Sequence, residues 1–488
     1  MIFNTISYLV FLAISVVTYW SLPHRFRMWL LLGASLVFYG LWRIEFVALI
    51  TFSAFVDYYF SLKIQDSEDA RWRRIFMIAS VSTNLGLLLY FKYTYFIIDN
   101  LSPLTGITAS DARASIGNIL LPLGISFYTF LSISYTIDVF RREFVPIRSF
   151  SHYLTYVMFW PHMIAGPILR AGELIPQLVA PSSPGRDAVA NALRAILFGL
   201  FLKVGLADNL APLVDEAFRL PVKSIGGLDV WTMAFAFGLQ IYFDFAGYSM
   251  IAIGSAALLG ITFPQNFNWP YLAGSPREFW RRWHITLSSW IRDYLYLPLS
   301  GLRATSHSSG GIDIQFQQTA KRAGGIGPTP ALFVTWFVMG LWHGASWNFA
   351  LWGIWHATFI SLFRLISPYL PSNIGPVGRL IGWGLTLAIA MLGWIPFRSP
   401  DVATTFALFG RLFDLHSYFS LGFRENTYLV VFIMFVGMLT LHWMGKIEWQ
   451  GRLGRIVHGV ASTVAVAAAT FTVFIFLRPV AQFIYFQF

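Results

Sequence analysis

Long apolar segments recur along most of this chain, and they constrain its fold more than any other feature. Of the 488 residues, 56% are hydrophobic and only 12% are charged, whereas soluble domains carry about 25% charged residues. A globular core could not hide so much apolar surface from water. We therefore predict an all-α, polytopic integral membrane protein whose solvent is the lipid bilayer.

The apolar segments differ in length, and this difference bears on how many of them cross the membrane. A spanning helix needs about 20 mostly apolar residues, and several segments are shorter, as re-entrant or broken helices are. We expect about 11 full spans plus partial ones, in one membrane-embedded domain over residues 1–488, with the first segment kept as a helix rather than cleaved as a signal peptide. The segments are 2–20, 28–41, 46–62, 75–98, 119–140, 153–164, 188–206, 230–259, 333–342, 347–366, 381–397, 428–443 and 457–477.

Basic residues gather in short loops between the apolar segments, which accounts for the net charge of +11. Cytoplasmic loops carry an excess of Lys and Arg, so these loops should face the cytoplasm, whereas residues 99–118, poor in both, should face outward. Neither a basic stripe nor a nucleic-acid-binding motif is found, so we expect no nucleic-acid partner. The three loops hold Lys63, Arg71, Arg73 and Arg74; Arg141, Arg142 and Arg148; and Lys446, Arg452 and Arg455.

Two histidines in apolar, aromatic surroundings are the strongest candidates for chemistry. His343 follows Trp342 and precedes Gly344, and His284 follows Trp283. An ionisable group at membrane depth is costly and usually serves a function, and histidine is well suited to proton transfer near neutral pH. A hydrogen-bonded structural role is the alternative for each. His356 lies 13 positions after His343. A continuous helix would place it on the far side from His343, and we favour a structural or gating role for it.

Arginines and tryptophans alternate along residues 276–301, which we predict to be a helix containing His284. Arg277 and Arg281 share one face, and Glu278 can pair with Arg282 at i,i+4. Guanidinium groups bind phosphates bidentately, so these three arginines, together with Trp283, could bind a phosphorylated acyl donor. The alternative is that the arginines snorkel to lipid headgroups.

One carboxylate within an apolar segment and the absence of cysteine limit the kinds of active site that the chain can form. Asp244 lies within an apolar span and needs a partner, either an Arg or a His in a working site or the cation of an internal salt bridge. The chain has no Cys, which excludes disulfides, thiolate metal sites and a cysteine acyl-enzyme. Because the histidines also lack metal-ligand spacing, we expect no metal.

An ordered series of motifs resembles the membrane-bound O-acyltransferase superfamily, in particular the bacterial branch that serves alginate O-acetylation and the D-alanine transfer of teichoic acids. The resemblance is clear over residues 1–398 and only generic over 399–488. The motifs are LPLGISFYTF at 121–130, IAGPILR at 164–170, residues 242–254, PQNFN at 264–268, residues 278–301 and residues 340–352.

The resemblance implies a ring of tilted helices around a central tunnel in the bacterial cytoplasmic (inner) membrane. His343 matches the family's catalytic histidine and His284 its second histidine. The donor is implied to be a cytoplasmic thioester, commonly acetyl-CoA, with no tightly bound cofactor. The acyl group would pass to an extracytoplasmic polysaccharide through a separate acetyl-handling protein.

The chain departs from the family pattern at three places, and two other functions stay open. Met250 stands where the family has Asp, Ser300 stands where it has Gly, and the loop over 304–330 is longer than expected. Our predicted function is a membrane O-acetyltransferase subunit with His343 as general base. One alternative is D-alanyl transfer from a carrier protein. Another is a proton-coupled transporter, although such proteins often contain internal repeats and none is visible here.

Overall fold

The described part of the chain is mostly helical. The computed structural model describes residues 3–105, 108–164, 166–180, 182–302, 326–371, 375–447 and 451–477, and within these ranges it contains helices and no β-strands. The predicted all-α fold is confirmed. The chain forms two compact units: unit 1 comprises Met1–Arg219, Phe235–Asn266 and Phe423–Phe488, and unit 2 comprises Leu220–Ala234 and Phe267–Gly422.

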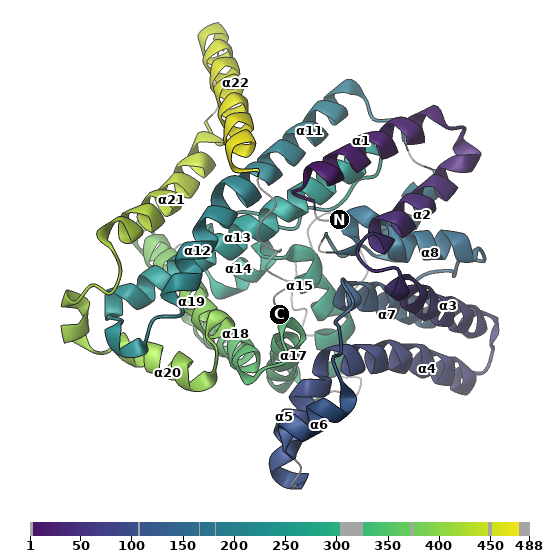
Figure 1. The fold of residues 1–488 in the computed structure, drawn as a ribbon, viewed down its shortest axis with the longest axis horizontal. Coiled ribbons are helices and arrows are strands. Elements are labelled where there is room, and N and C mark those ends of the chain that lie inside the picture. The colour runs from purple at the N-terminus through teal and green to yellow at the C-terminus, as the bar shows by residue number, and fades with distance from the viewer. Residues whose placement is uncertain are drawn as a thin grey trace. The chain divides into compact units, whose positions relative to one another are not determined.

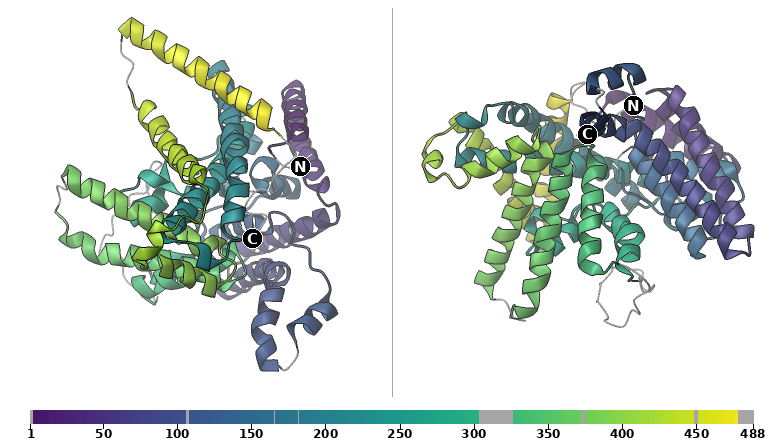
Figure 2. Two further views of the ribbon diagram at one scale, coloured as in Figure 1. Left: turned by 60° about the vertical axis from the view of Figure 1, so that its left-hand side comes forward. Right: turned by 90° about the horizontal axis from the view of Figure 1, so that it is seen from below.

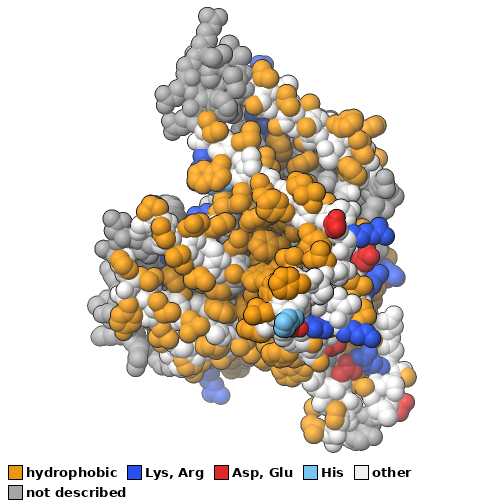
Figure 3. All heavy atoms as spheres, turned by 90° about the vertical axis from the view of Figure 1, so that its left-hand side faces the viewer, with side chains coloured by type: hydrophobic (Ala, Val, Ile, Leu, Met, Phe, Trp, Pro, Cys, Tyr) orange, Lys and Arg blue, Asp and Glu red, His pale blue; other side chains and the backbone are white. Residues whose placement is uncertain are grey.

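Eight helical stretches among the described residues are long and apolar enough to cross a membrane, so the polytopic architecture is confirmed. The shorter helix Ile6–Ser21 is also apolar, and the total of about 11 spans stays a prediction. Hydrophobic side chains cover most of the described surface in Figure 3, with few charged ones among them. The eight stretches are Glu45–Asp66, Ala70–Thr105, Arg186–Ala217, Gly227–Leu258, Trp347–Tyr369, Pro376–Arg398, Glu425–Met444 and Gly459–Phe476.

The N-terminal part of unit 1 is a helical bundle (Figure 1), in which α3 packs against α4, α7 and α8. Small buried side chains such as Ser53, Ala54 and Ser80 allow these helices to approach closely. The helices are α1 (Ile6–Ser21), α2 (His24–Gly40), α3 (Glu45–Asp66), α4 (Ala70–Leu88), η1 (Leu89–Tyr93), α5 (Thr94–Thr105), α6 (Ala109–Ile116), α7 (Ile125–Arg141), α8 (Phe150–Met158), α9 (Trp160–Met163) and α10 (Ala171–Val179).

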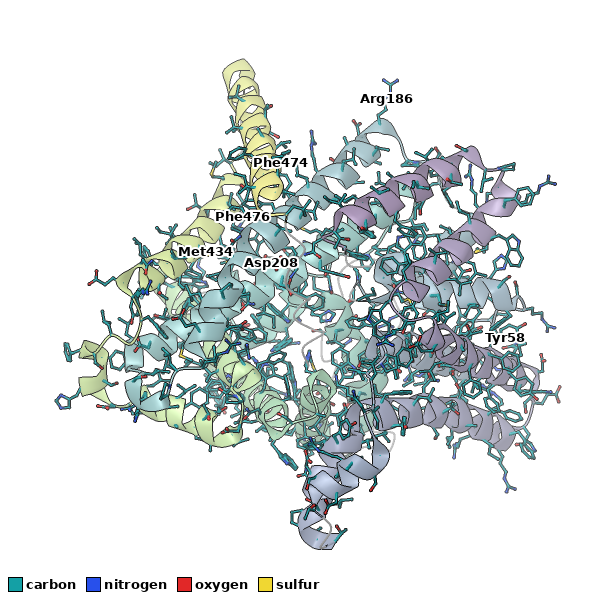
Figure 4. The ribbon with its side chains drawn as sticks, viewed as in Figure 1. Tyr58, Arg186, Asp208, Met434, Phe474 and Phe476 are labelled. Atoms are coloured by element: carbon teal, nitrogen blue, oxygen red, sulfur yellow. The ribbon has the colours of Figure 1, made fainter. Side chains whose placement is uncertain are left out.

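The rest of unit 1 is built around the close approach of α11 and α13. A Cβ added to Gly199 would lie 2.6 Å from the Gly247 carbonyl oxygen, and one added to Gly254 would lie 2.6 Å from that of Ala192, so both helices need glycine there. Figure 4 labels Asp208 on α12 and Phe474 on α22. The Phe474 side chain is largely exposed, as expected for a residue beside lipid. The elements are α11 (Arg186–Leu200), the π-helix η2 (Phe201–Ala207), α12 (Asp208–Ala217), α13 (Gly227–Leu258), α21 (Glu425–Met444) and α22 (Gly451–Phe476).

Unit 2 is organised by a helical hairpin and the helices that pack on it. A Cβ at Gly340 would lie 2.1 Å from the Phe349 carbonyl oxygen, which shows how closely α17 and α18 pack. The pair α18 and α19 also lies side by side, as Figure 2 shows in its right-hand view. The elements are η3 (Val222–Ser224), η4 (Pro270–Leu272), α14 (Pro276–Arg282), α15 (Ile285–Ile291), η5 (Arg292–Tyr296), α16 (Leu297–Ser300), α17 (Pro328–His343), α18 (Trp347–Ile366), η6 (Ser367–Tyr369), α19 (Pro376–Arg398), α20 (Val402–Arg411) and η7 (Leu415–Phe419).

Two of the basic loops lie together at one end of the N-terminal bundle. The Arg142 guanidinium donates to the Gln65 carbonyl oxygen over 3.1 Å, and Arg148 lies 3.6 Å from Asp66. Both loops therefore lie on the same side of the membrane, as the distribution of charge predicts. In the third loop, the side chains of Arg452 and Arg455 lie outside the described residues.

We expect thiol labelling to place residues 99–118 outside the cell and the 63–74 loop inside. Ser67 precedes the spanning stretch Ala70–Thr105, and Ser110 follows it. Because the chain has no native Cys, Ser110→Cys should react with a membrane-impermeant maleimide in intact cells, and Ser67→Cys only after the cells are opened. Labelling of Ser67→Cys alone in intact cells would invert the orientation.

Candidate active site

His343 is the last residue of α17 and is held in an aromatic enclosure. His343 is only 4% exposed. The centre of its ring lies 4.8 Å from that of Trp342, 4.9 Å from that of Trp352 and 5.3 Å from that of Phe397. Trp352 comes from α18 and Phe397 from α19. Three helices of unit 2 therefore fix this imidazole and limit the access of bulk water to it.

The chain bends directly after His343, and the sequence explains the bend. Gly344 adopts an extended conformation that ends α17, and the Ser346 hydroxyl accepts from the Asn348 N–H to begin α18. A Cβ at Gly344 would lie 2.0 Å from a ring carbon of Phe349, so glycine is required there. The Gly beside the histidine therefore serves to fold the hairpin tightly.

His356 shares an aromatic neighbour with His343, whereas a continuous helix would place the two on opposite sides. The bend at Gly344 folds α18 back along α17, so Trp352 contacts both imidazoles, at ring distances of 4.9 Å to His343 and 5.0 Å to His356. The Trp280 indole N–H donates to Nδ1 of His356 over 3.4 Å. This hydrogen bond gives His356 a structural partner within the same aromatic cluster.

His284 lies at a break between two helices, and the predicted helix over 276–301 is wrong at this point. The carbonyl of Arg282 accepts from the Asn268 N–H over 2.9 Å, so it is diverted from the helical ladder. The residue at 284 has φ 41° and ψ 56°, a left-handed conformation that is uncommon for a non-glycine residue and often marks a functional site. The predicted helix missed this break because a tertiary hydrogen bond, from the Asn268 N–H to the Arg282 carbonyl, accompanies it.

The His284 imidazole is fully buried, with Phe267 stacked at a ring distance of 6.2 Å. It lies outside the eight candidate spans, and burial lowers its pKa to about 3 because the charged form loses its hydration. The ring is therefore neutral at physiological pH. A neutral imidazole can donate from one nitrogen and accept at the other.

An aromatic cluster connects the surroundings of the two candidate histidines. Trp283 is 2% exposed, and its ring lies 4.9 Å from that of Trp394 and 5.1 Å from that of Phe267. Trp394 in turn stacks with Trp352 at 6.2 Å. Trp283, predicted as a donor-binding residue, is thus placed inside the protein, between the residues that enclose His284 and those that enclose His343.

The three predicted donor-binding arginines have different surroundings. Arg282 pairs with Glu278 at 2.6 Å, which confirms the expected i,i+4 pair. Arg281 is exposed, and among the described residues it forms no ion pair. Arg277 is half-buried and lies near the phenol of Tyr296. Arg281 is therefore the cation of this helix whose charge is most available to a ligand.

Asp244 forms a buried salt bridge with Lys203 in unit 1. The Lys203 ammonium lies 2.6 Å from Asp244 and 2.7 Å from Asp208, and the Lys203 side chain is only 2% exposed. The internal salt bridge is confirmed, and its cation is Lys203. Lys203 was missed, although a single Lys inside the apolar segment 188–206 could have indicated it.

The positions that depart from the family pattern have ordinary structural surroundings. Met250 is half-buried on α13. Ser300 is buried at the end of α16, followed by Gly301 with φ 74°, a conformation that favours glycine. Most of the 304–330 loop, residues 304–325, lies outside the described residues.

Comparison with known proteins agrees with the resemblance. Residues 133–312 match the membrane-bound O-acyltransferase family. A probable alginate O-acetylase of Azotobacter vinelandii is 37% identical over 85% of this chain and 78% of its own length. A peptidoglycan O-acetyltransferase of Helicobacter pylori is 32% identical over 77% of this chain and 71% of its own length.

A more distant relative is a teichoic acid D-alanyltransferase of Streptococcus thermophilus, which is 29% identical over 48% of this chain and 54% of its own length. The relatives that match most of the chain are thus O-acetylases. The buried histidines, the polytopic helical architecture and the extent of these matches lead to one conclusion. The chain belongs to the membrane-bound O-acyltransferase family, whose members transfer acyl groups to hydroxyls.

Proposed function

We propose that this O-acyltransferase takes an acetyl group from cytoplasmic acetyl-CoA for the O-acetylation of an extracytoplasmic polysaccharide. The relatives that match most of the chain are named for O-acetylation of alginate and peptidoglycan. The observation that carries the proposal is the enclosure of His343 at the end of α17, where three helices hold one imidazole among aromatic rings.

His343 acts as the general base in this proposal. Its imidazole takes the proton from the attacking hydroxyl, whose oxygen forms the new ester bond to the acetyl carbon while the C–S bond of the thioester breaks. The imidazolium then returns the proton to the departing thiolate, so the base is regenerated. Because the chain has no Cys, an acyl-enzyme would need Ser or Thr, and direct transfer is the simpler path.

His284 orients or polarises the reacting groups. Its imidazole is buried and neutral, so it supplies a single N–H donor without adding charge. A neutral donor of this kind can stabilise the negative charge that develops on a thioester carbonyl oxygen. The strained backbone at this residue is consistent with a side chain held in a set direction.

Arginine side chains of α14 meet the phosphates of the donor in this proposal. Arg281 carries the main role because it is exposed and forms no ion pair among the described residues. Arg282 shares its charge with Glu278 at 2.6 Å, and Arg277, one turn before Arg281 on the same helix, is half-buried. The neutralised Arg282 should therefore contribute less to an incoming phosphate than Arg281.

Arg281→Ala should raise the KM for acetyl-CoA more than it lowers kcat. A charge-assisted hydrogen bond contributes about 1.5–3 kcal/mol, which corresponds to a roughly 10- to 150-fold change. Initial rates of the purified protein as a function of acetyl-CoA concentration measure this change. Arg282→Ala is the matched control and should change KM less. An unchanged KM in Arg281→Ala would favour contact of this arginine with lipid headgroups.

A transfer assay distinguishes the proposed donor from its alternative. The purified protein is supplied with radiolabelled acetyl-CoA or with a D-alanyl carrier protein, and release of free CoA or carrier is followed. Turnover of acetyl-CoA that is lost in His343→Ala supports the proposal. Turnover of the carrier thioester alone would assign D-alanyl transfer. Neither outcome is expected of a proton-coupled transporter, which would not turn over a thioester.

The location and partners follow from this chemistry. A donor made in the cytoplasm and an acceptor outside it require a protein in the bacterial inner membrane, with its helices around a tunnel that joins the two sides. We propose that a separate extracytoplasmic protein receives the acetyl group and delivers it to the polysaccharide.

A further inference from the structure

A carboxylate lies at the centre of the N-terminal bundle of unit 1 without a cation opposite it. Asp57 on α3 is 0% exposed, and in the described part of the chain it forms no ion pair. A charged group inside an apolar helix bundle is costly unless a counter-charge or a proton neutralises it. In the buried cluster of Asp244 and Asp208, Lys203 supplies the counter-charge. The charge of Asp57 must be neutralised in another way.

One oxygen of Asp57 is held by a network of donors. Oδ1 accepts from the Ser80 hydroxyl over 2.6 Å and from the Asn84 amide over 2.6 Å. The Asn84 amide is itself oriented, because its oxygen accepts from the Ser53 hydroxyl over 2.9 Å. Ser80 also lies 3.0 Å from the Thr136 hydroxyl. Two donors on one carboxylate oxygen stabilise the ionised form of the group.

The other oxygen of Asp57 lies among hydroxyls that also lack partners. Oδ2 has no hydrogen bond among the described residues, and the same holds for the buried hydroxyls of Ser61, Ser132 and Tyr153. Ser132 lies close to both the Asp57 carboxyl and the Tyr153 phenol, and Ser61 lies one turn from Asp57 on α3. Buried polar atoms in folded proteins normally have well-formed hydrogen bonds, so these four oxygens without one indicate a ligand that oxygen atoms coordinate.

We propose that Asp57, Ser61, Ser132 and Tyr153 form a binding site for a small monovalent cation of the Na⁺ class. All four contribute oxygen, the ligand atom of hard cations, and the single carboxylate matches a single positive charge, whereas Ca²⁺ sites usually contain several carboxylates. The titratable groups that face Asp57 from the helices packed around it are Tyr128, Tyr135 and Tyr153. Since none of these is a cation, an external ion completes the charge balance.

The bound ion would join three helices that the sequence places far apart. Asp57 and Ser61 lie on α3, Ser132 on α7 and Tyr153 on α8, and these helices pack against one another. The site does not depend on the proposed acetyl transfer, because all of its residues lie in unit 1 and both candidate catalytic histidines lie in unit 2. Cation binding should therefore appear as increased stability of the folded protein.

Thermal unfolding of the purified full chain in detergent tests this site, followed by the fluorescence of its 19 tryptophans. At constant pH and ionic strength, choline chloride is replaced stepwise by NaCl. Above the dissociation constant, each tenfold rise in Na⁺ should add an equal increment to the melting temperature, and choline should add none. Asp57→Asn should abolish this response, whereas Asp244→Asn, a matched change at another buried carboxylate of unit 1, should retain it.

Ser132→Ala keeps the test decisive if Asp57→Asn does not fold. This variant removes one oxygen ligand and should move the Na⁺ response to higher concentrations. Identical melting temperatures of the wild type in NaCl and choline chloride would overturn the proposal, and a melting temperature that then rises as the pH falls would assign a proton to Asp57. A Na⁺ response that is unchanged in both Asp57→Asn and Ser132→Ala would also overturn it.

Discussion

His343→Ala should reduce acetyl transfer by roughly 10²- to 10⁴-fold, the usual cost of losing a general acid–base group. The imidazole is 4% exposed and is enclosed by Trp342, Trp352 and Phe397, so no other side chain or bulk water can readily take its place. The loss should appear in kcat, because the proposed base acts on the hydroxyl and does not hold the donor. Acetyl transfer to the acceptor at saturating acetyl-CoA measures it.

A second histidine variant separates a chemical effect from damage to the fold. His343→Gln fills most of the same volume in the aromatic enclosure but cannot act as a base, so it should be as inactive as His343→Ala while folding more like the wild type. Wild-type transfer by either variant, at equal amounts in the membrane, would rule out His343 as the base. His356→Gln is a useful comparison, because that residue shares Trp352 with His343 and should affect stability more than chemistry.

The helical architecture could be predicted from hydropathy because lipid imposes a strong constraint on length and composition. The stretch Pro376–Arg398 contains the predicted segment 381–397, and Glu425–Met444 contains 428–443. The division into units could not be predicted, because it depends on which helices pack together. The glycines that set the close packing of α11 with α13 are visible in the sequence, but their partners, such as Gly199 with Gly247, are not.

Residues of the candidate site could be proposed from the sequence, but their geometry could not. The Glu278–Arg282 pair follows from helical spacing and is present. The break at His284 depends on Asn268, which takes the Arg282 carbonyl, and such a tertiary hydrogen bond leaves no local signal. The position of His356 could not be predicted either, because the bend at Gly344 brings this residue into contact with Trp352. The spacing of 13 residues suggested opposite faces only if one helix ran through both histidines.

Lys203→Ala should destabilise the protein by about 3–5 kcal/mol, the usual cost of removing one partner of a buried ion pair. Lys203 lies 2.6 Å from Asp244 and 2.7 Å from Asp208, so its loss leaves two carboxylates close together without their cation. Gly205 of the same π-helix also packs against Thr472 of α22, so the damage should reach the contact between η2 and that helix. A lower melting temperature of the purified protein in detergent measures the effect.

Asp244→Asn is the matched variant, and the net charge that it leaves in the cluster predicts a smaller loss of stability than for Lys203→Ala. With all three groups ionised, the cluster holds one positive and two negative charges. Lys203→Ala leaves two negative charges, whereas Asp244→Asn leaves Lys203 paired with Asp208 and a net charge of zero. If both variants melt at the same temperature as the wild type, the cluster does not stabilise the helices. If Asp244→Asn is the less stable of the two, the Lys203–Asp244 contact carries the stability and Asp208, whose side chain is 11% exposed, contributes little.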